Sequence, residues 1–434
     1  MSLSLSVRIC LSEWITQLLE AVPIRSRATF VELLCACLIS PEGWVTRAIA
    51  SMLRRKHWTT YYKLIERGHV TVLPLAHALL GLISRVVPPQ ILTLVIDDTL
   101  VPRKSRSAPG SAIRHDHSKK TNRPEFLTAQ CWITLGLSVR FRSGTKSVLP
   151  VLSRLVPATG NRNKLTMALD MVQAMRPAIS QRVRVLFDCW FMRARLVLPL
   201  LAEGCAVIGQ ARIDTALFLH PTVPDTPRRG RKRIYGERLT PAMIEALPAH
   251  ECRLSLYGET QRIRLRSIIV LARFLKATPV HAVWCQFHDP DKDTWSKPRL
   301  MLASETALGA QHIVRLYARR WGIEPLFHNL KRWWGAANLW QQSVPALELW
   351  MHIRSMAWVL AQLLILVADN AFPIRQVAPW RVGCVLTAGL IAQWMRIEFT
   401  GLAFRDGFDQ KSQQFCFPSP RNDPRVREFT GQPP

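Results

Sequence analysis

Four residues in the C-terminal third of the chain have types and a spacing that suit phosphate chemistry. Tyr317, Arg320, Glu324 and Lys331 stand at offsets of three, seven and fourteen residues. At about 100° per residue, a helix would carry all four side chains within an arc of roughly 60°. A carboxylate holds a metal ion while neighbouring cations take phosphate oxygens, so this face suits a metal-assisted reaction on a nucleic-acid backbone. The alternative is a solvated helix face with charge pairs.

The identity and spacing of these four residues match the Y-R-E-K signature of bacterial insertion-sequence DDE transposases, which the chain resembles. A strand-then-helix lead-in, LMLASETALGAQHIVRLYARRW, runs into the signature, and the resemblance covers about residues 90–335. It implies a cut-and-paste transposase with a ribonuclease-H-like catalytic core. It also requires two further carboxylates elsewhere in the chain.

The composition indicates a polyanionic partner. The chain of 434 residues has 58 Lys and Arg against 30 Asp and Glu, a net charge of +28 that a metabolic enzyme does not need. The basic residues are spread over the whole length rather than clustered beside an apolar anchor, which favours DNA or RNA over a membrane surface. With 48% hydrophobic residues, the chain can bury a large core in two or three domains.

Several features predict a cytoplasmic protein, which the resemblance places at a bacterial nucleoid. The first residues contain no long apolar region with a cleavage site, so we expect no secretory signal. The apolar runs 356–368 and 382–395 are too short to span a bilayer and contain Gln362 and Gln393, so we expect buried helices and no membrane. The ten cysteines form no C-x₂-C pairs and are expected to be reduced.

The order of elements predicts a ribonuclease-H-like α/β core. Helical patterns occupy about residues 10–85 and end before Pro88 and Pro89. The part around residues 48–65 permits either a helix-turn-helix or a plain helical bundle with a basic face. Apolar segments then predict three strands, a helix, a strand, a helix and a strand; the strands are expected at 91–97, 126–139, 147–156, 182–188 and 205–213.

Residues 214–298 leave that order and predict a β-rich insertion with a basic loop. After Lys331 the pattern is helical and rich in Trp, which indicates packing. We therefore expect six segments: a helical DNA-binding or dimerisation domain at 1–89, the first part of the core at 90–213, the insertion at 214–298, the second part of the core with Glu324 at 299–345, C-terminal helices at 346–403, and a poorly ordered tail at 404–434.

Three acids stand where this layout would gather them. Asp97 and Asp98 end the first strand and Asp188 ends the fourth, and these strands are parallel neighbours in a ribonuclease-H-like sheet. Glu324 is placed to join them. Three acids can hold two Mg²⁺ ions, which activate a water or a 3′-hydroxyl and stabilise the leaving oxygen. The alternatives are a strand-ending turn at Asp97 and a helix N-cap at Asp188.

The resemblance assigns roles to these positions. An Asp-x-Thr match at 97–99 favours Asp97 as first metal ligand, with Asp98 the alternative, and the match at VLFDCW gives Asp188. It implies two Mg²⁺ ions, with Mn²⁺ able to substitute, and a homodimer that binds double-stranded DNA as terminal inverted repeats and target. Tyr317, Arg320 and Lys331 would grip phosphates around a hairpin intermediate with a flipped base. Stacking candidates for that base are Trp284 and Trp295.

A second set of cations is expected to contact the DNA backbone from the insertion. It forms the basic loop and comprises Arg228, Arg229, Arg231, Lys232 and Arg233. By contrast, the segment 115–117, His-Asp-His, is not expected to bind metal, because alternate residues of a strand face opposite ways and Lys119 and Lys120 repel cations.

Two questions stay open at the level of sequence. Pro325 directly follows Glu324, so the helix either restarts there, with Pro325 in its first turn, or kinks. The resemblance implies a transposase that cleaves and joins DNA; the alternatives are a nuclease of the same fold that never joins, or a non-catalytic DNA-binding regulator derived from a transposase.

Overall fold

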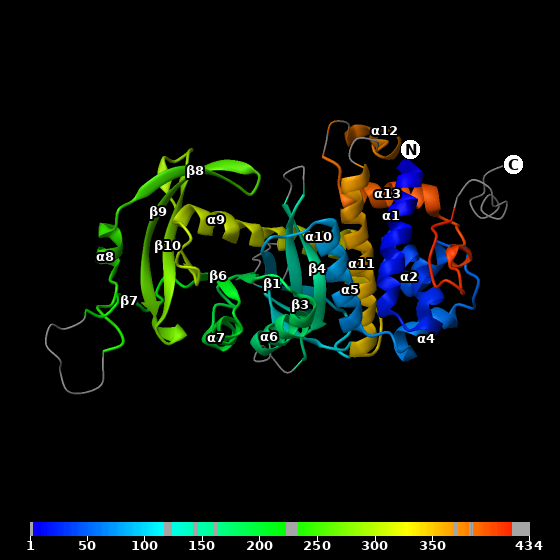
Figure 1. The fold of residues 1–434 in the computed structure, drawn as a ribbon, viewed down its shortest axis with the longest axis horizontal. Coiled ribbons are helices and arrows are strands. Elements are labelled where there is room, and N and C mark those ends of the chain that lie inside the picture. Colours follow the sequence, from blue (N-terminus) through cyan, green and yellow to red (C-terminus); the bar gives the residue numbers. More distant parts are fainter. Residues whose placement is uncertain are drawn as a thin grey trace.

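The protein is a mixed α/β molecule in which helices gather at one end and strands extend to the other (Figure 1). A computed structural model describes residues 3–116, 124–141, 146–158, 164–222, 233–368, 372–381, 383 and 385–418. Its α/β class and its large mixed sheet agree with the sequence prediction. The chain runs from the helical end through the sheet and returns to the helical end (Figure 1).

Five helices form before the first strand. They are α1 (Leu3–Leu18), α2 (Arg27–Ile39), α3 (Val45–Ala50), α4 (Thr59–Arg67) and α5 (Val72–Val86). Twelve of the thirteen residues of α2 are buried, because this mostly apolar helix lies inside the helical layer. The segment for which we predicted a possible helix-turn-helix contains α3 and α4, and that role stays a prediction.

The C-terminal helices complete this layer. They are α11 (Val344–Ala368), α12 (Ile374–Val377) and α13 (Ala388–Phe399). The helix α11 has 25 residues, so it begins well before the apolar run that the sequence singled out. By length and composition it could cross a membrane, but 78% of its most apolar window is buried inside the protein, against α2 and the strand β4. It is the central helix of the layer.

Five strands make the central part of the sheet. They are β1 (Leu92–Pro102), β3 (Phe126–Arg140), β4 (Lys146–Leu155), β5 (Val183–Phe187) and β6 (Ala206–Ala211). Their order is β4-β3-β1-β5-β6. The first three are antiparallel, whereas β5 and β6 run parallel to β1. Every residue of β5 is buried, as expected of a branched apolar strand covered on both faces.

Two helices and one short strand surround these five strands. The crossover from β4 to β5 contains α6 (Lys164–Met175), and the crossover from β5 to β6 contains α7 (Ala194–Ala202). The strand β2 (Ser111–His115) pairs with the first residues of β3, while β4 pairs with the remainder along the same edge.

The strands of residues 214–303 continue this sheet instead of forming one of their own. They are β7 (Leu217–Phe218), β8 (His250–Leu256), β9 (Glu259–Ala272), β10 (Thr278–Asp289), β11 (Thr294–Trp295) and β12 (Arg299–Ala303), with α8 (Pro241–Ala246) before β8. The strand β12 pairs with β6 on one side and β10 on the other, which joins the β-rich part to the core. The sequence led us to expect a separate insertion, because pairing between distant strands leaves no local signal.

Residues 404–418 are folded, which differs from the expectation of a poorly ordered tail from residue 404. A 3₁₀ turn, η9 (Phe404–Gly407), is followed by Phe415 and Phe417, which are 3% and 2% exposed. Backbone N–H groups of these two phenylalanines donate to hydroxyls of Thr16 and Ser12 on α1. The phenylalanines follow no helix or strand period, so the pattern did not predict their burial. Residues 419–434 lie outside the described part.

The fold predicts an acid-sensitive core at His352 on α11. This side chain is 2% exposed, and burial lowers its pKa to about 3, from about 6.5 in an unfolded chain. Above pH 6.5 its contribution to stability is complete. Below pH 6.5 the unfolded chain takes up a proton that the folded protein excludes, so the free energy of unfolding falls by about 1.4 kcal/mol per pH unit.

Urea titrations at pH 7.5 and pH 5 measure this effect. The parent is expected to lose about 2 kcal/mol more than His352→Gln between the two conditions, because the amide does not titrate. His312→Gln, at an exposed position in the helix of residues 310–318, is the control and should behave as the parent does. Equal losses for the parent and His352→Gln would contradict the assignment.

Candidate active site

The structure brings Asp97 and Asp188 together at the end of the parallel pairing of β1 and β5. The last register pair is Ile96 with Phe187, so the next residue of each strand is an aspartate. The strand β1 itself continues to Pro102, because its second half pairs with β3 alone. Asp97 therefore lies inside a strand, not at its end as the sequence suggested. Asp188 Oδ1 accepts hydrogen bonds from the N–H groups of Trp190 and Phe191, which fixes the turn after β5.

Burial makes these two carboxylates expensive as anions. It raises the pKa of Asp97 to about 7, an increase that Arg320 opposes and that Asp188 and Asp98 add to. Burial also raises the pKa of Asp188, against the two backbone hydrogen bonds. Raised pKa values of neighbouring acids are typical of sites that hold a cation or move a proton.

The helical run after β12 carries the signature residues. It consists of α9 (Ala310–Ala318), a 3₁₀ turn η6 (Arg319–Gly322) and α10 (Ile323–Trp333). Pro325 is the third residue of α10, where a backbone N–H has no partner inside the helix. The structure thus shows the first of the two alternatives, a restarted helix with Pro325 in its first turn. Glu324 lies in that same turn.

Arg320 links two of the predicted ligands. Its Nη1 lies 2.6 Å from Asp97 Oδ2, and its Nη2 lies 3.2 Å from Glu324 Oε1. A guanidinium therefore stands between the carboxylates, where it balances the negative charge that burial penalises. Glu324 is the more accessible of the two, with its side chain 42% exposed against 16% for Asp97.

The other two signature residues also contact the sheet. Lys331 Nζ donates to Thr99 Oγ1 at 2.9 Å and to the Leu100 carbonyl at 3.5 Å. The Tyr317 hydroxyl donates to Gln210 Oε1 on β6 at 3.3 Å, and burial raises its pKa. The four residues thus share one side of the run, as the spacing predicted. The phosphate contacts of Tyr317, Arg320 and Lys331 and the metal contact of Glu324 stay predictions, because here these side chains bind protein groups.

Asp98 has a different environment from Asp97. Lys164 Nζ on α6 lies 3.0 Å from Asp98 Oδ1, and the thiol of Cys131 donates to Oδ2 at 3.2 Å. The same ammonium lies 3.9 Å from the ring centroid of Trp190. Successive residues of a strand face opposite ways, so Asp98 pairs with Lys164 on one face of the sheet and Asp97 pairs with Arg320 on the other. Sequence reasoning missed Lys164, which follows a loop and carries no motif.

The predicted DNA contacts of residues 214–298 are only partly visible. Four cations of the basic loop, Arg228, Arg229, Arg231 and Lys232, lie outside the described residues, and Arg233 is exposed. Trp284 is 3% exposed on β10, so in this conformation it has no free face for a base. Trp295 already stacks on Arg264, whose guanidinium lies 4.1 Å from the ring.

An aromatic pair beside the catalytic helix was missed. Tyr257 occupies the β8–β9 turn, and its ring centroid lies 5.8 Å from that of Trp321 in η6. Both side chains are nearly half exposed, and Arg320 and Glu324 are close enough to act on the pKa of the Tyr257 phenol, which burial raises. Tyr257 and Gly258 both have positive φ, which indicates a tight turn that the dipeptide Tyr-Gly marks in the sequence.

The donor set fits a divalent metal ion. Asp97, Asp188 and Glu324 offer hard carboxylate oxygens, and Arg320 is the cation that pairs with Asp97 among the residues that the structure describes. In the described part of the chain, no three His, Cys, Asp or Glu side chains are already arranged around a metal position. Glu324 would bind the metal ion together with the two aspartates once the Arg320 guanidinium moves out from between Asp97 and Glu324.

Comparison with known proteins gives a family for more than half of the chain. A sequence model of the family described as DDE superfamily endonuclease matches residues 17–268. The match includes Asp97 and Asp188 and ends before Glu324. No curated protein matches the chain.

One solved structure gives a weak likeness. The synaptic complex of piggyBac transposase with hairpin DNA aligns over 86% of this chain and 70% of that chain, at 12% identity and a TM-score of 0.37. A score of that size establishes nothing beyond a loose similarity of shape.

Replacing Asp97 tests the charge balance of the site without any substrate. The folded protein holds a proton on Asp97 up to about pH 7, whereas an unfolded aspartate loses it near pH 3.8. Stability of the metal-free parent therefore falls as pH rises through this window. In Asp97→Asn that fall is absent, so the free energy of unfolding relative to the parent is expected to rise by about 2 kcal/mol between pH 5 and pH 7.5.

Asp98→Asn is the matched control, measured by the same urea titrations in a chelating buffer. It leaves Lys164 buried without its carboxylate, so we expect a loss of about 3 kcal/mol. If Asp97→Asn gained no stability relative to the parent between pH 5 and pH 7.5, the assignment of Asp97 as the perturbed acid would be wrong.

Proposed function

The chain belongs to the DDE superfamily endonucleases, and from this premise we propose that it is a DNA transposase. It binds the ends of its own mobile element and catalyses metal-dependent cleavage and strand transfer. The observation that carries the proposal is the pair of partly buried aspartates on adjacent parallel strands, joined to Glu324 through Arg320. A purely structural role would not require two neighbouring carboxylates that burial penalises as anions and that share a single guanidinium.

Endonucleases of this superfamily use divalent metal ions, and we propose two Mg²⁺ ions here, with Mn²⁺ able to substitute. Asp97, Asp188 and Glu324 would hold them. When bound, the metal ions generate the nucleophile from water or a 3′-hydroxyl and neutralise charge on the leaving oxygen.

The residues of the chain then position the scissile phosphate. Arg320 leaves Asp97 and offers its planar guanidinium to two phosphate oxygens, a geometry that suits it better than lysine. Lys331 and Tyr317 would change partners in the same way. Lys331 would leave Thr99, Tyr317 would leave Gln210, and both would bind the phosphate adjacent to the scissile one. In each case a phosphate oxygen replaces an acceptor on the protein. Binding of DNA would therefore free Asp97 from Arg320 and make its carboxylate available to a metal ion.

The finer family assignment rests on sequence and topology together. The Y-R-E-K spacing and the strand order β4-β3-β1-β5-β6 support a ribonuclease-H-like transposase of a bacterial insertion sequence. A homodimer follows from the need to pair two element ends before transfer, and the net charge of +28 supports a location on nucleoid DNA.

A hairpin intermediate with a flipped base also belongs to this proposal. For the base, Tyr257 and Trp321 are better placed than Trp284, because both are accessible and lie beside Arg320 and Glu324. Base stacking on an aromatic side chain contributes about 1 to 3 kcal/mol, which would offset part of the cost of extruding the base.

The cleavage prediction uses a labelled DNA duplex that carries the element end. With Mg²⁺ the parent is expected to nick it, whereas Asp188→Asn and Glu324→Gln reduce the rate about a thousandfold, because metal-ion stabilisation contributes several kcal/mol to such a reaction. Binding of the duplex in a chelating buffer should stay within about twofold of the parent. Asp170→Asn, at an exposed acid on α6, is the control and should cleave normally.

Two alternatives are separated by the products. A nuclease that never joins, which the family description also allows, gives nicks but no insertions when cut ends and a target plasmid are supplied. A regulator gives binding without Mg²⁺-dependent nicking. Cleavage that persists in both acid variants would overturn the assignment of the site.

A further inference from the structure

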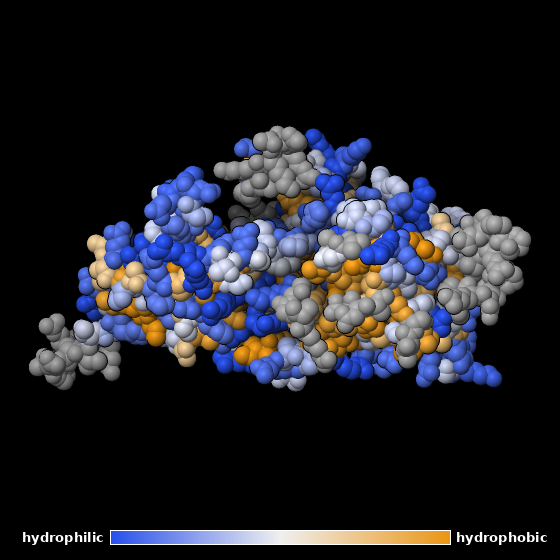
Figure 2. Space-filling model, turned by 90° about the horizontal axis from the view of Figure 1, so that it is seen from above, coloured by the Kyte–Doolittle hydropathy of each residue, from blue (hydrophilic) through white to orange (hydrophobic). Residues whose placement is uncertain are grey.

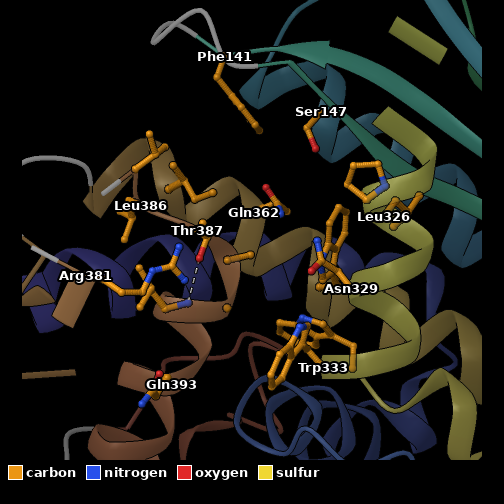
Figure 3. A pocket seen from close by; sticks show the side chains of 18 of the residues that line it. Phe141, Ser147, Leu326, Asn329, Trp333, Gln362, Arg381, Leu386, Thr387 and Gln393 are labelled. Carbon is orange, nitrogen blue, oxygen red and sulfur yellow. Dashed lines mark hydrogen bonds between the residues drawn. The ribbon is translucent and has the colours of Figure 1, made fainter. Parts of the chain in front are cut away.

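A cavity of about 540 Å³ lies beside α10 (Figure 3). Its wall on α10 includes Leu326, Asn329 and Trp333, which at about 100° per residue stand roughly 140° to 180° around the helix from Glu324. The other walls come from the ends of β3 and β4, from α11, and from the segment leading into α13. Its volume is within the roughly 300 to 1,000 Å³ of ligand pockets.

Accessible tryptophans line this cavity. Trp333 is 60% exposed and Trp380 is 78% exposed, whereas Trp334 and Trp358, which also line it, are buried. Apolar side chains reach the surface mainly in the half of the molecule that holds the helices (Figure 2). A large aromatic ring left in solvent is costly unless a ligand covers it, and the π-faces of tryptophan suit planar rings.

Two amide side chains enter the same space. Asn329 from α10 and Gln362 from α11 point into the cavity (Figure 3). Neither amide has a hydrogen-bond partner among the residues that the structure describes, although both are partly buried. Each amide offers donors and an acceptor side by side, which is the pattern that pairs with the edge of a nucleobase.

Cations gather at the mouth. Lys146 lines the cavity, and Arg319, Arg140 and Arg315 are close enough that their charges, after burial, lower the pKa of its ammonium. Arg381 lines the opposite wall. Over the described ranges none of these five cations has a carboxylate within ion-pair distance, whereas Arg154 and Arg184 nearby do. A group of cations without acidic partners attracts an anion such as a phosphate.

We propose that this cavity binds one unpaired nucleotide of single-stranded DNA. The base lies against Trp333 and Trp380, and its edge pairs with the amides of Asn329 and Gln362. Phosphates of the same strand lie along Lys146, Arg319 and their neighbours. The source of the strand rests on the proposed function, since a site that opens a DNA end at Glu324 releases a single strand next to α10.

The combination of groups selects this occupant over others. An apolar side chain of a protein partner would use the tryptophans but leave two amides and five cations without partners. A free phosphate would use the cations alone. Single-stranded DNA uses all three sets of groups, in the way that aromatic platforms and basic grooves bind it in general.

The test measures fluorescence anisotropy of a labelled twelve-nucleotide oligo-dT in a chelating buffer, which prevents cleavage. Trp333→Ala is expected to weaken binding about tenfold through lost stacking. Lys146→Ala is expected to weaken it less and to lower the slope of log K against log salt by about 0.7, the value of one phosphate contact on a single strand. Asn329→Ala is a second cavity variant at a position that is not part of the apolar core.

Controls come from matched positions away from the cavity. Trp340→Ala removes a tryptophan that is 67% exposed, and Lys411→Ala removes an exposed lysine near the C-terminal end of the described chain; both should bind as the parent does. Thermal unfolding followed by circular dichroism verifies that each variant is folded. If Trp333→Ala and Asn329→Ala bind the oligonucleotide as tightly as the parent does, the proposal is wrong.

Failure of this proposal and failure of the proposed function give different results. If duplex nicking depends on Asp188 but oligonucleotide binding does not depend on Trp333, the proposed nucleotide site is wrong and the transposase assignment stands. If oligonucleotide binding depends on Trp333 but the parent does not nick the duplex, the proposed nucleotide site stands and the transposase assignment is wrong.

Discussion

Like charges held together in a protein interior need a cation, and the arrangement around Asp97 and Asp188 follows from that requirement. Parallel pairing of β1 with β5 makes the two carboxylates neighbours, and burial penalises both as anions. Arg320 supplies the balancing charge from the 3₁₀ turn between α9 and α10, and through it Glu324 is tied to the sheet. A metal ion would satisfy the same requirement, which is why one constellation suits both a resting ion pair and a catalytic centre.

The position of α10 depends on the helical layer as well as on Arg320. Arg354, fully buried on α11, donates to the carbonyls of Trp334 at the end of α10 and of Ser40 at the end of α2. The C-terminal ends of two helices, which carry partial negative charge, thus share one cation. Gly43 and Gly335 meet so closely that neither position has room for a Cβ. Helices far from the acids therefore set the register of the helix that carries Glu324.

Local chemistry was predictable from the sequence, whereas partners across the fold were not. Spacing was sufficient to place Tyr317, Arg320, Glu324 and Lys331 on one side of a helical run, and apolar strands ending in acids located Asp97 and Asp188. The ion pair of Asp98 with Lys164 joins residues 66 positions apart, and no local sequence pattern predicts such a contact. The same holds for β12, which merges the β-rich part with the core, and for Phe415 and Phe417, which pack without any period.

Anomalous diffraction from crystals of the protein grown with Mn²⁺ and an element-end duplex would test the central claim most directly. The account predicts a metal peak coordinated by the carboxylates of Asp97 and Asp188, with Glu324 at its edge and Arg320 moved from Asp97 to a phosphate. A peak at Asp98, or an Arg320 that still bridges Asp97 and Glu324 with DNA bound and no metal between them, would contradict it.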